Sequence, residues 1–93
     1  MTIRVTDEAI THLREIRAWW REHGDVAVFD ADLDAAVEQL LSAPRSGSPY
    51  PRRLGIRRIL LRRTRYHLYY SVDGDEVLVR AVWHAVRGRD PAL

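Results

Sequence analysis

The sequence predicts a single α+β domain over residues 1–93. In this domain an N-terminal strand and a helical hairpin pack on one face of a three- to four-stranded antiparallel sheet. Two observations predict it. Apolar residues recur at helical spacing up to residue 43 and at every second position in the second half. A loop rich in proline, glycine and serine, residues 44–51, separates the two patterns and joins two halves of one domain.

The composition excludes several classes of protein. Because the chain has no cysteine, it has no disulfide, no thiolate nucleophile and no cysteine metal site. No apolar stretch approaches the roughly 20 residues that span a bilayer. Residues 1–5 lack the apolar core of a signal peptide. We therefore expect a cytoplasmic protein.

Charge is distributed unevenly along the chain. All 15 basic residues are arginine. Residues 1–43 hold four arginines and nine acids, a net charge of −5, whereas residues 44–93 hold eleven arginines and four acids, a net charge of +7. A GC-rich genome explains the missing lysine but not this separation. The second half is therefore expected to meet an anionic partner, either nucleic acid or an acidic protein segment.

The first half has the signals of two helices. Thr6 is expected to cap a helix that begins with Asp7 and Glu8, and Gly24 to end it in a left-handed conformation. Asp25 is expected to cap the second helix. The stripes expected to be buried are Ile10, Leu13, Ile16 and Trp20, then Val26, Phe29, Leu33, Val37, Leu40 and Leu41, with Asp30, Asp32, Asp34 and Glu38 left on the surface.

The second half has a hairpin signal. Asp73-Gly74 lies between two alternating runs and predicts a type I′ turn that pairs Val72 with Asp75. One face of the hairpin is then apolar: Tyr66, Leu68, Tyr70, Val77, Val79, Ala81 and Trp83. The other is open and mostly polar: Arg65, His67, Tyr69, Ser71, Glu76, Leu78, Arg80 and Val82, with His84 just beyond the pairing.

A third strand is expected over residues 56–61. If Arg63-Thr64 is the turn that follows it, Ile59 and Leu61 join the apolar face and Arg58 joins the basic face. A slip of one residue would exchange Arg57 for Arg58, and the sequence leaves both registers open. Residues 2–5 favour a further strand at the edge of the sheet.

The basic face carries the residues that could act in catalysis or bind an anion. His67 and His84 lie near several arginines, and like charge lowers the pKa of an imidazole, which suits a general base or a phosphate contact. The alternative is surface histidines without a role. Arg58 (or Arg57), Arg65 and Arg80 project from adjacent strands, and Arg87 and Arg89 follow the last strand. Their forked donors match phosphate or carboxylate, unless the face is simply solvated.

Several other side chains have simpler interpretations. Tyr69 on the basic face offers a ring that can stack on a base. Trp19 lies beside the helical stripe and is a candidate partner contact. His12 and His23 are expected to be solvated, whereas Trp20, Tyr66, Tyr70 and Trp83 are expected in the core. No residues have the spacing of metal ligands, a glycine-rich phosphate loop or a nucleophile elbow, so no cofactor is expected.

The predicted order of elements is similar to that of the RelE/ParE superfamily, the toxins of bacterial type II toxin–antitoxin pairs. The likeness runs over nearly the whole chain. It rests on the segments 40–44 with Gly47, 54–59, 66–73 and 82–87. RelE-like members are ribosome-dependent mRNA endoribonucleases with Arg and Lys on the open face and usually a C-terminal Tyr. ParE-like members poison DNA gyrase and lack that set.

The resemblance implies a ParE-like protein here. His67 stands where the ribonucleases tend to hold arginine, the chain has no lysine, and residues 88–93 contain no tyrosine. We expect a gyrase inhibitor that a cognate antitoxin neutralises in a hetero-oligomer. Candidate partner contacts are Trp19, Arg57, Arg58, Arg65, Tyr69, Arg87 and Arg89.

Two alternatives remain open at this point. One is an mRNA endoribonuclease that acts by general acid–base catalysis. Its candidate catalytic residues are Arg58, Arg65, His67, Arg80, His84 and Arg87. The other is a toxin fold retained without toxicity.

Overall fold

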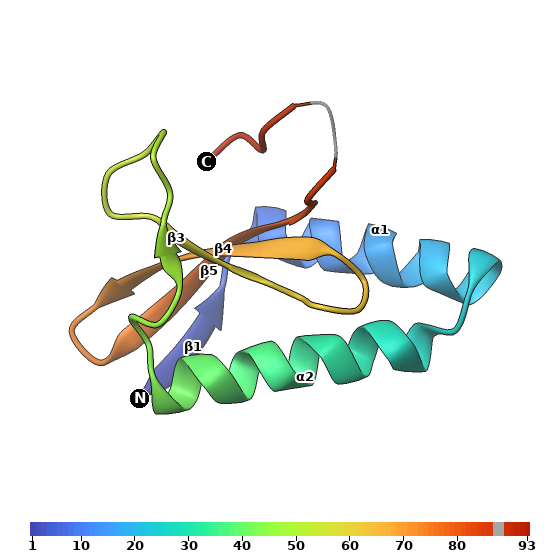
Figure 1. Ribbon diagram of the computed structural model, residues 1–93, viewed down its shortest axis with the longest axis horizontal. Helices are drawn as coiled ribbons and strands as arrows, with labels where there is room; N and C mark the ends of the chain where they lie inside the picture. Colours follow the sequence, from blue (N-terminus) through green and yellow to red (C-terminus); the bar gives the residue numbers. More distant parts are fainter. Residues whose placement is uncertain (87–88) are drawn as a thin grey trace.

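The computed structural model describes residues 1–86 and 89–93. Within them two helices pack on one face of a five-stranded mixed sheet of order β1-β5-β4-β3-β2 (Figure 1). Strand β1 is parallel to β5, and the other neighbours are antiparallel. The predicted α+β architecture and N-terminal edge strand are therefore confirmed, but the sheet has five strands with one parallel pair instead of three or four antiparallel strands, because the short β2 adds to the far edge and β1 runs parallel to β5. The elements are β1 (Thr2–Val5), α1 (Asp7–His23), α2 (Val26–Ser42), β2 (Ser48–Pro49), β3 (Arg57–Leu60), β4 (Tyr66–Asp73) and β5 (Glu76–His84).

Both helices begin where the sequence predicts. The Thr6 hydroxyl accepts a hydrogen bond from the amide of Ala9, and the Asp25 carboxylate accepts one from the amide of Ala27. Gly24 does end α1, but its φ of −160° is extended, so the predicted left-handed conformation is wrong. Glycine suits the position for another reason: a Cβ there would lie 2.8 Å from the Trp20 ring.

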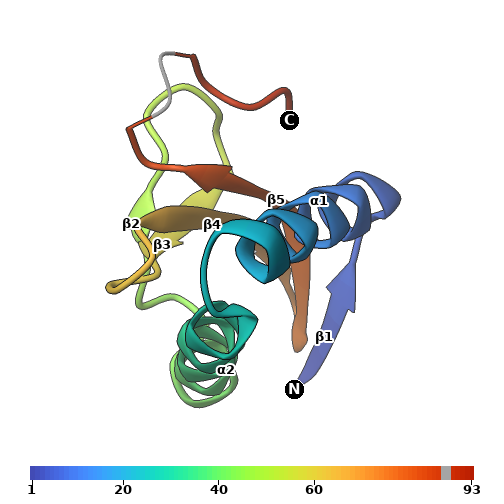
Figure 2. The same ribbon diagram turned by 90° about the vertical axis from the view of Figure 1, so that its right-hand side faces the viewer.

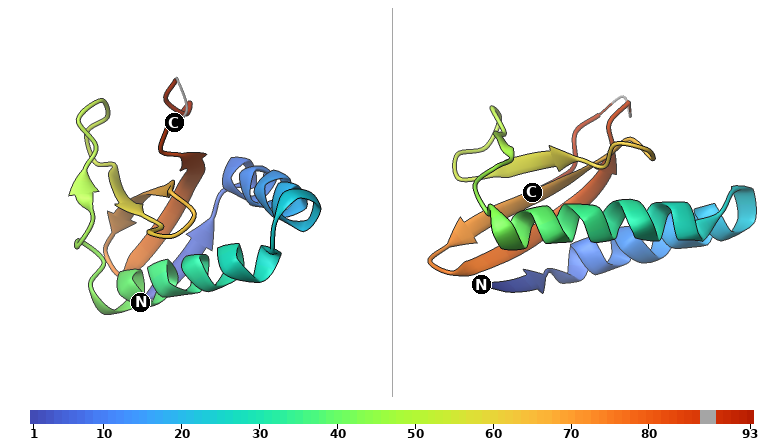
Figure 3. Two further views of the ribbon diagram at one scale, coloured as in Figure 1. Left: turned by 45° about the vertical axis from the view of Figure 1, so that its right-hand side comes forward. Right: turned by 60° about the horizontal axis from the view of Figure 1, so that its bottom comes forward.

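The main core lies between the helices and the sheet (Figures 2 and 3). Phe29 and Leu40 of α2 are fully buried, as the helical spacing predicts, and Leu33 is partly buried at the edge of the core. Leu41 is 46% exposed, so its assignment to the stripe is wrong. The reason is helical geometry: the buried face of α2 runs through Ala36 and Leu40, and Leu41 is turned about 100° from Leu40.

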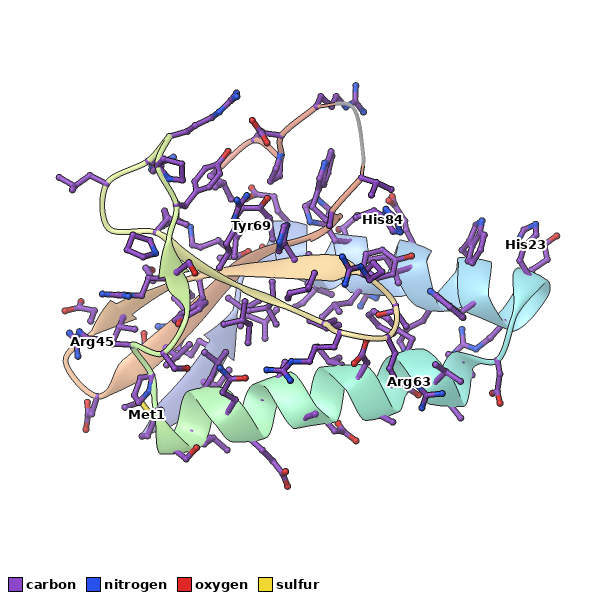
Figure 4. The ribbon with its side chains drawn as sticks, in the orientation of Figure 1. Met1, His23, Arg45, Arg63, Tyr69 and His84 are labelled. Carbon is purple, nitrogen blue, oxygen red and sulfur yellow. The ribbon has the colours of Figure 1, made fainter. Side chains whose placement is uncertain are left out.

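Asp32 is buried, which contradicts its predicted surface position. One carboxylate oxygen accepts hydrogen bonds from the amides of Arg63 and Thr64, at 3.2 and 2.9 Å, and from the Thr64 hydroxyl at 2.6 Å. Figure 4 shows Arg63 beside α2. The carboxylate therefore attaches α2 to the turn between β3 and β4, and these donors offset the cost of burying it.

The turn between β4 and β5 lies one residue later than predicted. Gly74 and Asp75 form the loop, Asp73 lies opposite Glu76, and Val72 pairs with Val77. Of the two loop residues only Gly74 has a positive φ, +60°, as in a type II′ turn. The predicted pairing of Val72 with Asp75 is therefore wrong. The shift is two residues along β5, so Val77 and Val79 still face the core.

A β-bulge changes the faces further along the hairpin. Tyr69 pairs with Ala81 and Tyr70 with Val79, so Arg80 is an extra residue in β5. One added residue inverts the alternation beyond it. Val82 consequently lies in the main core, whereas Ala81 and Trp83 belong to the outer face, the reverse of the prediction for each.

Strand β3 takes the first of the two registers left open. Ile59 lies opposite Leu68 and Arg58 opposite Tyr69, as a turn at Arg63-Thr64 requires. Ile59 and Leu61 pack in the main core. Arg58, rather than Arg57, therefore belongs to the outer face.

The outer face is not open as predicted. Tyr69 is only 2% exposed and packs with Tyr50, Ile56 and Ala81 in a second cluster that Leu93 joins. Figure 2 shows the segment between β2 and β3 and the C-terminal tail on the side of the sheet away from α2. The outer face is thus covered by loop and tail, which the period-two pattern of the strands does not reveal.

Candidate functional site

A polar hollow of about 410 Å³ lies beside β2 and β3, near the end of α2. We call it the basic hollow and define it by Ser46, Ser48, Arg58, Arg62 and His67. Its remaining lining residues carry no acidic group. Within the described part of the chain this is therefore a concave surface with cationic and hydroxyl groups but no carboxylate.

His67 is the titratable group in the basic hollow. It lies opposite Leu60 on one side and Trp83 on the other, and its ring centroid is 6.0 Å from that of Tyr69. Burial lowers the pKa of the imidazole below its ordinary value, and the charges of Arg58 and Arg65 lower it further. Both effects favour the neutral imidazole over the charged form.

The arginines near His67 are held in different ways. The Arg58 guanidinium carbon lies 5.4 Å from the centroid of the Tyr50 ring. Arg65 is exposed at the end of the β3–β4 turn with φ +68°. Arg57 instead donates to the carbonyl oxygens of Arg45 and Gly47, at 3.1 and 2.8 Å. Arg57 therefore fixes the loop before β2, whereas Arg58 and Arg65 supply charge to the outer side.

The wall of the basic hollow at residues 46–48 is closely packed. The Gly47 amide donates to the buried Tyr70 hydroxyl at 3.0 Å. A Cβ on Gly47 would lie 2.5 Å from that hydroxyl oxygen and 2.8 Å from the Arg58 carbonyl oxygen, so no side chain fits. The Ser46 hydroxyl accepts from the Gln39 side chain at 2.9 Å. These contacts fix the positions of the two flanking serines.

The remaining candidate catalytic residues do not join His67. His84 lies opposite Tyr66, and its ring meets the Tyr66 ring edge-on with centroids 5.0 Å apart, on the helix side of the sheet. The prediction that both histidines share the outer face is therefore wrong, because the bulge inverts the end of β5. Arg80 lies at the bulge, where its carbonyl accepts from the Thr6 hydroxyl. Arg87 lies outside the described residues.

A second hollow, of about 400 Å³, lies between α1 and the end of β5. We call it the aromatic cleft and define it by His12, Trp19, Trp20, Trp83 and His84. Trp19 is 50% exposed, which fits its predicted surface position. His12 is half-buried, and its Nδ1 accepts from the amide of Val82, so the prediction of a solvated side chain is wrong.

Trp83 stands between the aromatic cleft and the C-terminal tail. Its indole N–H donates to the carbonyl of Arg89 at 2.8 Å, and the Arg89 guanidinium carbon lies 5.9 Å from its ring. Arg52 and Asp90 form an ion pair at 2.6 Å, and the Arg53 guanidinium donates to the backbone oxygen of Leu93. The tail is therefore attached to the outer face at several points.

The comparisons with known proteins agree with this architecture. Residues 3–88 match the sequence model of the ParE toxin of the type II toxin–antitoxin system parDE. The chain belongs to the ParE toxin family. A search of curated proteins found no match.

Solved structures of related toxins have the same fold. The chromosomal ParDE system of P. aeruginosa matches with a TM-score of 0.73 and 20% identity, over 90% of this chain and 95% of that chain. The intact E. coli RelBE complex matches with a TM-score of 0.64 and 22% identity, over 92% and 98%. Isolated E. coli RelE matches with a TM-score of 0.63 and 22% identity, over 94% and 86%.

The ParE-family fold positions residues that the sequence interpretation did not select. Arg62, Ser46 and Ser48 reach the basic hollow from turns, where no periodic pattern predicts a direction. One sequence feature could have predicted the half-buried position of His12, namely its i, i+4 spacing to Ile16 on the buried side of α1. Among the described residues no helix has the length and apolarity to cross a membrane, and no group of acids and histidines is placed to hold a metal.

Proposed function

We propose that this ParE-family toxin inhibits DNA gyrase in the cytoplasm and that a cognate antitoxin neutralises it. The observation that carries the choice of target is the separation of His67 from His84 on opposite faces of the sheet. RNA cleavage by acid–base catalysis needs two proton-transfer groups near one phosphate. A non-enzymatic inhibitor needs no such pair. The ParE family match over residues 3–88 supports the same choice.

The test compares two activities of one preparation. The full chain is added to gyrase with plasmid DNA, and supercoiling and cleaved-DNA complexes are measured. The same chain is added to a translation reaction, and messages are mapped by primer extension. We expect loss of supercoiling and accumulation of cleaved complexes with intact messages. Cuts within codons together with normal supercoiling would reverse the proposal, and no effect in either assay would indicate a toxin fold without toxicity.

An mRNA endoribonuclease is the second candidate because of one observation. The pKa of His67 is lowered by burial and by Arg58 in a hollow without carboxylates, which suits a base near a phosphate. Its test is His67→Gln, with His23→Gln as the control, since His23 is exposed on α1. For a gyrase inhibitor neither variant, nor the unaltered chain, cuts translated messages. For a nuclease His67→Gln abolishes cleavage while His23→Gln does not.

The antitoxin is proposed to lay apolar side chains over the aromatic cleft. Structural relatives of this chain are toxin–antitoxin complexes. Trp19, half-exposed at the cleft, is the aromatic anchor that such interfaces favour. Acidic antitoxin residues are expected near Arg89 and the other arginines of the outer side. The product is a toxin–antitoxin hetero-oligomer.

The antitoxin proposal is tested by co-expression with the neighbouring small reading frame. We expect both chains to co-purify, and Trp19→Ala to weaken the complex by at least about tenfold. Arg14→Ala, at an exposed position of the same helix, serves as the control and should leave affinity unchanged. Failure to co-purify, or equal effects of the two variants, would contradict the proposed surface.

A further inference from the structure

The described arginines differ in their partners. Arg4, Arg17 and Arg52 each lie within 3.6 Å of a carboxylate oxygen, on Glu76, Asp30 and Asp90 respectively. Within the described part of the chain Arg58 and Arg62 of the basic hollow have no such acidic partner. Cationic groups gathered in a concave surface without counter-charge repel one another, and an anion bound among them removes that repulsion.

The donors of the basic hollow come from separate directions. Arg58 belongs to β3, Arg62 to the following turn, and Ser46 and Ser48 to the loop before β2. Because the Ser46 oxygen already accepts from Gln39, its hydroxyl proton is available to donate. Donors arranged in this way suit a group with oxygens on several sides. A tetrahedral phosphate has this form, whereas a planar carboxylate presents two oxygens in one plane.

The loop that carries the serines is held in one conformation by hydrogen bonds. The Gly47 amide is bonded to the Tyr70 hydroxyl, and the Gly47 carbonyl accepts from Arg57. Both partners are outside the proposed donor set, so the loop stays in place when Arg62 or Ser48 is changed. A preformed group of donors avoids the cost of ordering a loop at the moment of binding.

We propose that the basic hollow binds a phosphate group of the DNA that gyrase holds, so that the toxin contacts nucleic acid as well as the enzyme. The inference rests on the proposed function for the identity of the DNA. Arg58 and Arg62 supply the charge, and Ser46 and Ser48 supply hydroxyl donors. Arg65, exposed nearby, adds attraction for the adjacent phosphate.

His67 makes occupancy of the basic hollow measurable. The groups that act on His67 are the charges of Arg58 on β3 and Arg65 at the turn, with the ring of Tyr69 beside it, and Trp83 of β5 lies opposite it in the sheet. A bound phosphate opposes the two arginine charges and therefore raises the pKa of His67. By linkage, phosphate then binds more tightly as the pH falls.

The experiment uses the full isotope-labelled chain and does not need gyrase. The imidazole resonances of His67 are titrated with pH, alone, with inorganic phosphate and with a short DNA duplex. We expect the pKa of His67 to rise with both probes. DNA affinity, measured by fluorescence anisotropy, should fall about tenfold in Arg62→Gln, because a charge-assisted hydrogen bond is lost. Ser48→Ala should cause a smaller fall.

The matched control is Arg14→Gln, which makes the same change of charge on α1. It should bind DNA as the unaltered chain does. Equal weakening by Arg62→Gln and Arg14→Gln would overturn the proposal, because general attraction would then account for binding. Binding of an acidic peptide, or of RNA that is then cut, with no response to DNA would also overturn it.

The outcomes separate this inference from the proposed function. Gyrase inhibition without DNA binding or a His67 response overturns the phosphate site and leaves the proposed function standing. A His67 response that depends on Arg62, without gyrase inhibition, supports the phosphate site and contradicts the proposed function. The dependence of DNA affinity on salt gives an independent count of the phosphate contacts. Each contact contributes about −0.9 to the slope of the logarithm of the binding constant against the logarithm of the salt concentration.

Discussion

The two faces of the sheet are covered in different ways. The inner face meets α1 and α2, whose apolar residues repeat at helical spacing and fill a core that includes Phe29, Leu40 and Val82. The outer face meets a loop and the C-terminal tail, which bury Tyr69 through a small cluster around Tyr50. Regular elements cover a face continuously, whereas loop and tail cover only part of it.

The largest expected effect tests the inner face. Leu40→Ala removes a fully buried side chain and should lower the free energy of unfolding by about 2–5 kcal/mol. Its neighbour Leu41, which is 46% exposed, provides the control. Leu41→Ala should change the free energy of unfolding by less than about 0.5 kcal/mol. Urea unfolding followed by tryptophan fluorescence measures both. Similar losses for the two variants would mean that the buried face of α2 is wrongly placed.

The next effect tests how the inner face is joined to the β3–β4 turn. Asp32→Ala leaves the amides of Arg63 and Thr64 without their acceptor and should cost about 1–3 kcal/mol of unfolding free energy. Asp34→Ala, at an exposed position of the same helix, is the control and should be nearly neutral. Chemical denaturation measures the unfolding free energies of the two variants. A neutral Asp32→Ala would show that water replaces the carboxylate at no cost.

A smaller effect is expected at the outer face. Leu93 is only partly buried against the second cluster, so Leu93→Ala should cost about 1 kcal/mol of unfolding free energy. It should also increase the solvent exposure of Tyr69, measured by the near-ultraviolet absorbance of tyrosine on solvent perturbation. A loss of unfolding free energy as large as that of Leu40→Ala would contradict the prediction that the outer face contributes less to stability than the inner face.

The smallest effect is the dependence of stability on pH. The pKa of His67 is lower in the folded chain than its ordinary value of 6.5, so the unfolded chain binds more protons between those two values. Stability therefore rises with pH through this window and is lost as the pH falls from about 6.5 toward the folded pKa. Thermal unfolding across this range should show a weaker slope in His67→Gln than in His23→Gln. Equal slopes would contradict the lowered pKa.

Sequence patterns predicted the parts of the fold that local chemistry decides. Thr6 and Asp25 cap helices because their side chains reach the amide groups of the first turn. For β3 the sequence narrowed the register to two choices, and the structure takes the one that pairs Arg58 with Tyr69. The order of two helices followed by strands was predicted from the change of period at the proline-rich loop. These features depend on residues that are close together in the sequence.

Tertiary structure alone decided the composition of the candidate site. One extra residue at Arg80 moved His84 away from His67, and the alternating pattern contains no signal for that insertion. The burial of Asp32 and Tyr69 depends on contacts with segments more than ten residues away. Periodicity reports which side of an element is apolar, but it does not report what packs on the other side. For that reason the sequence determined the family and fold, while only the folded chain determined which arginines, serines and histidine share one hollow.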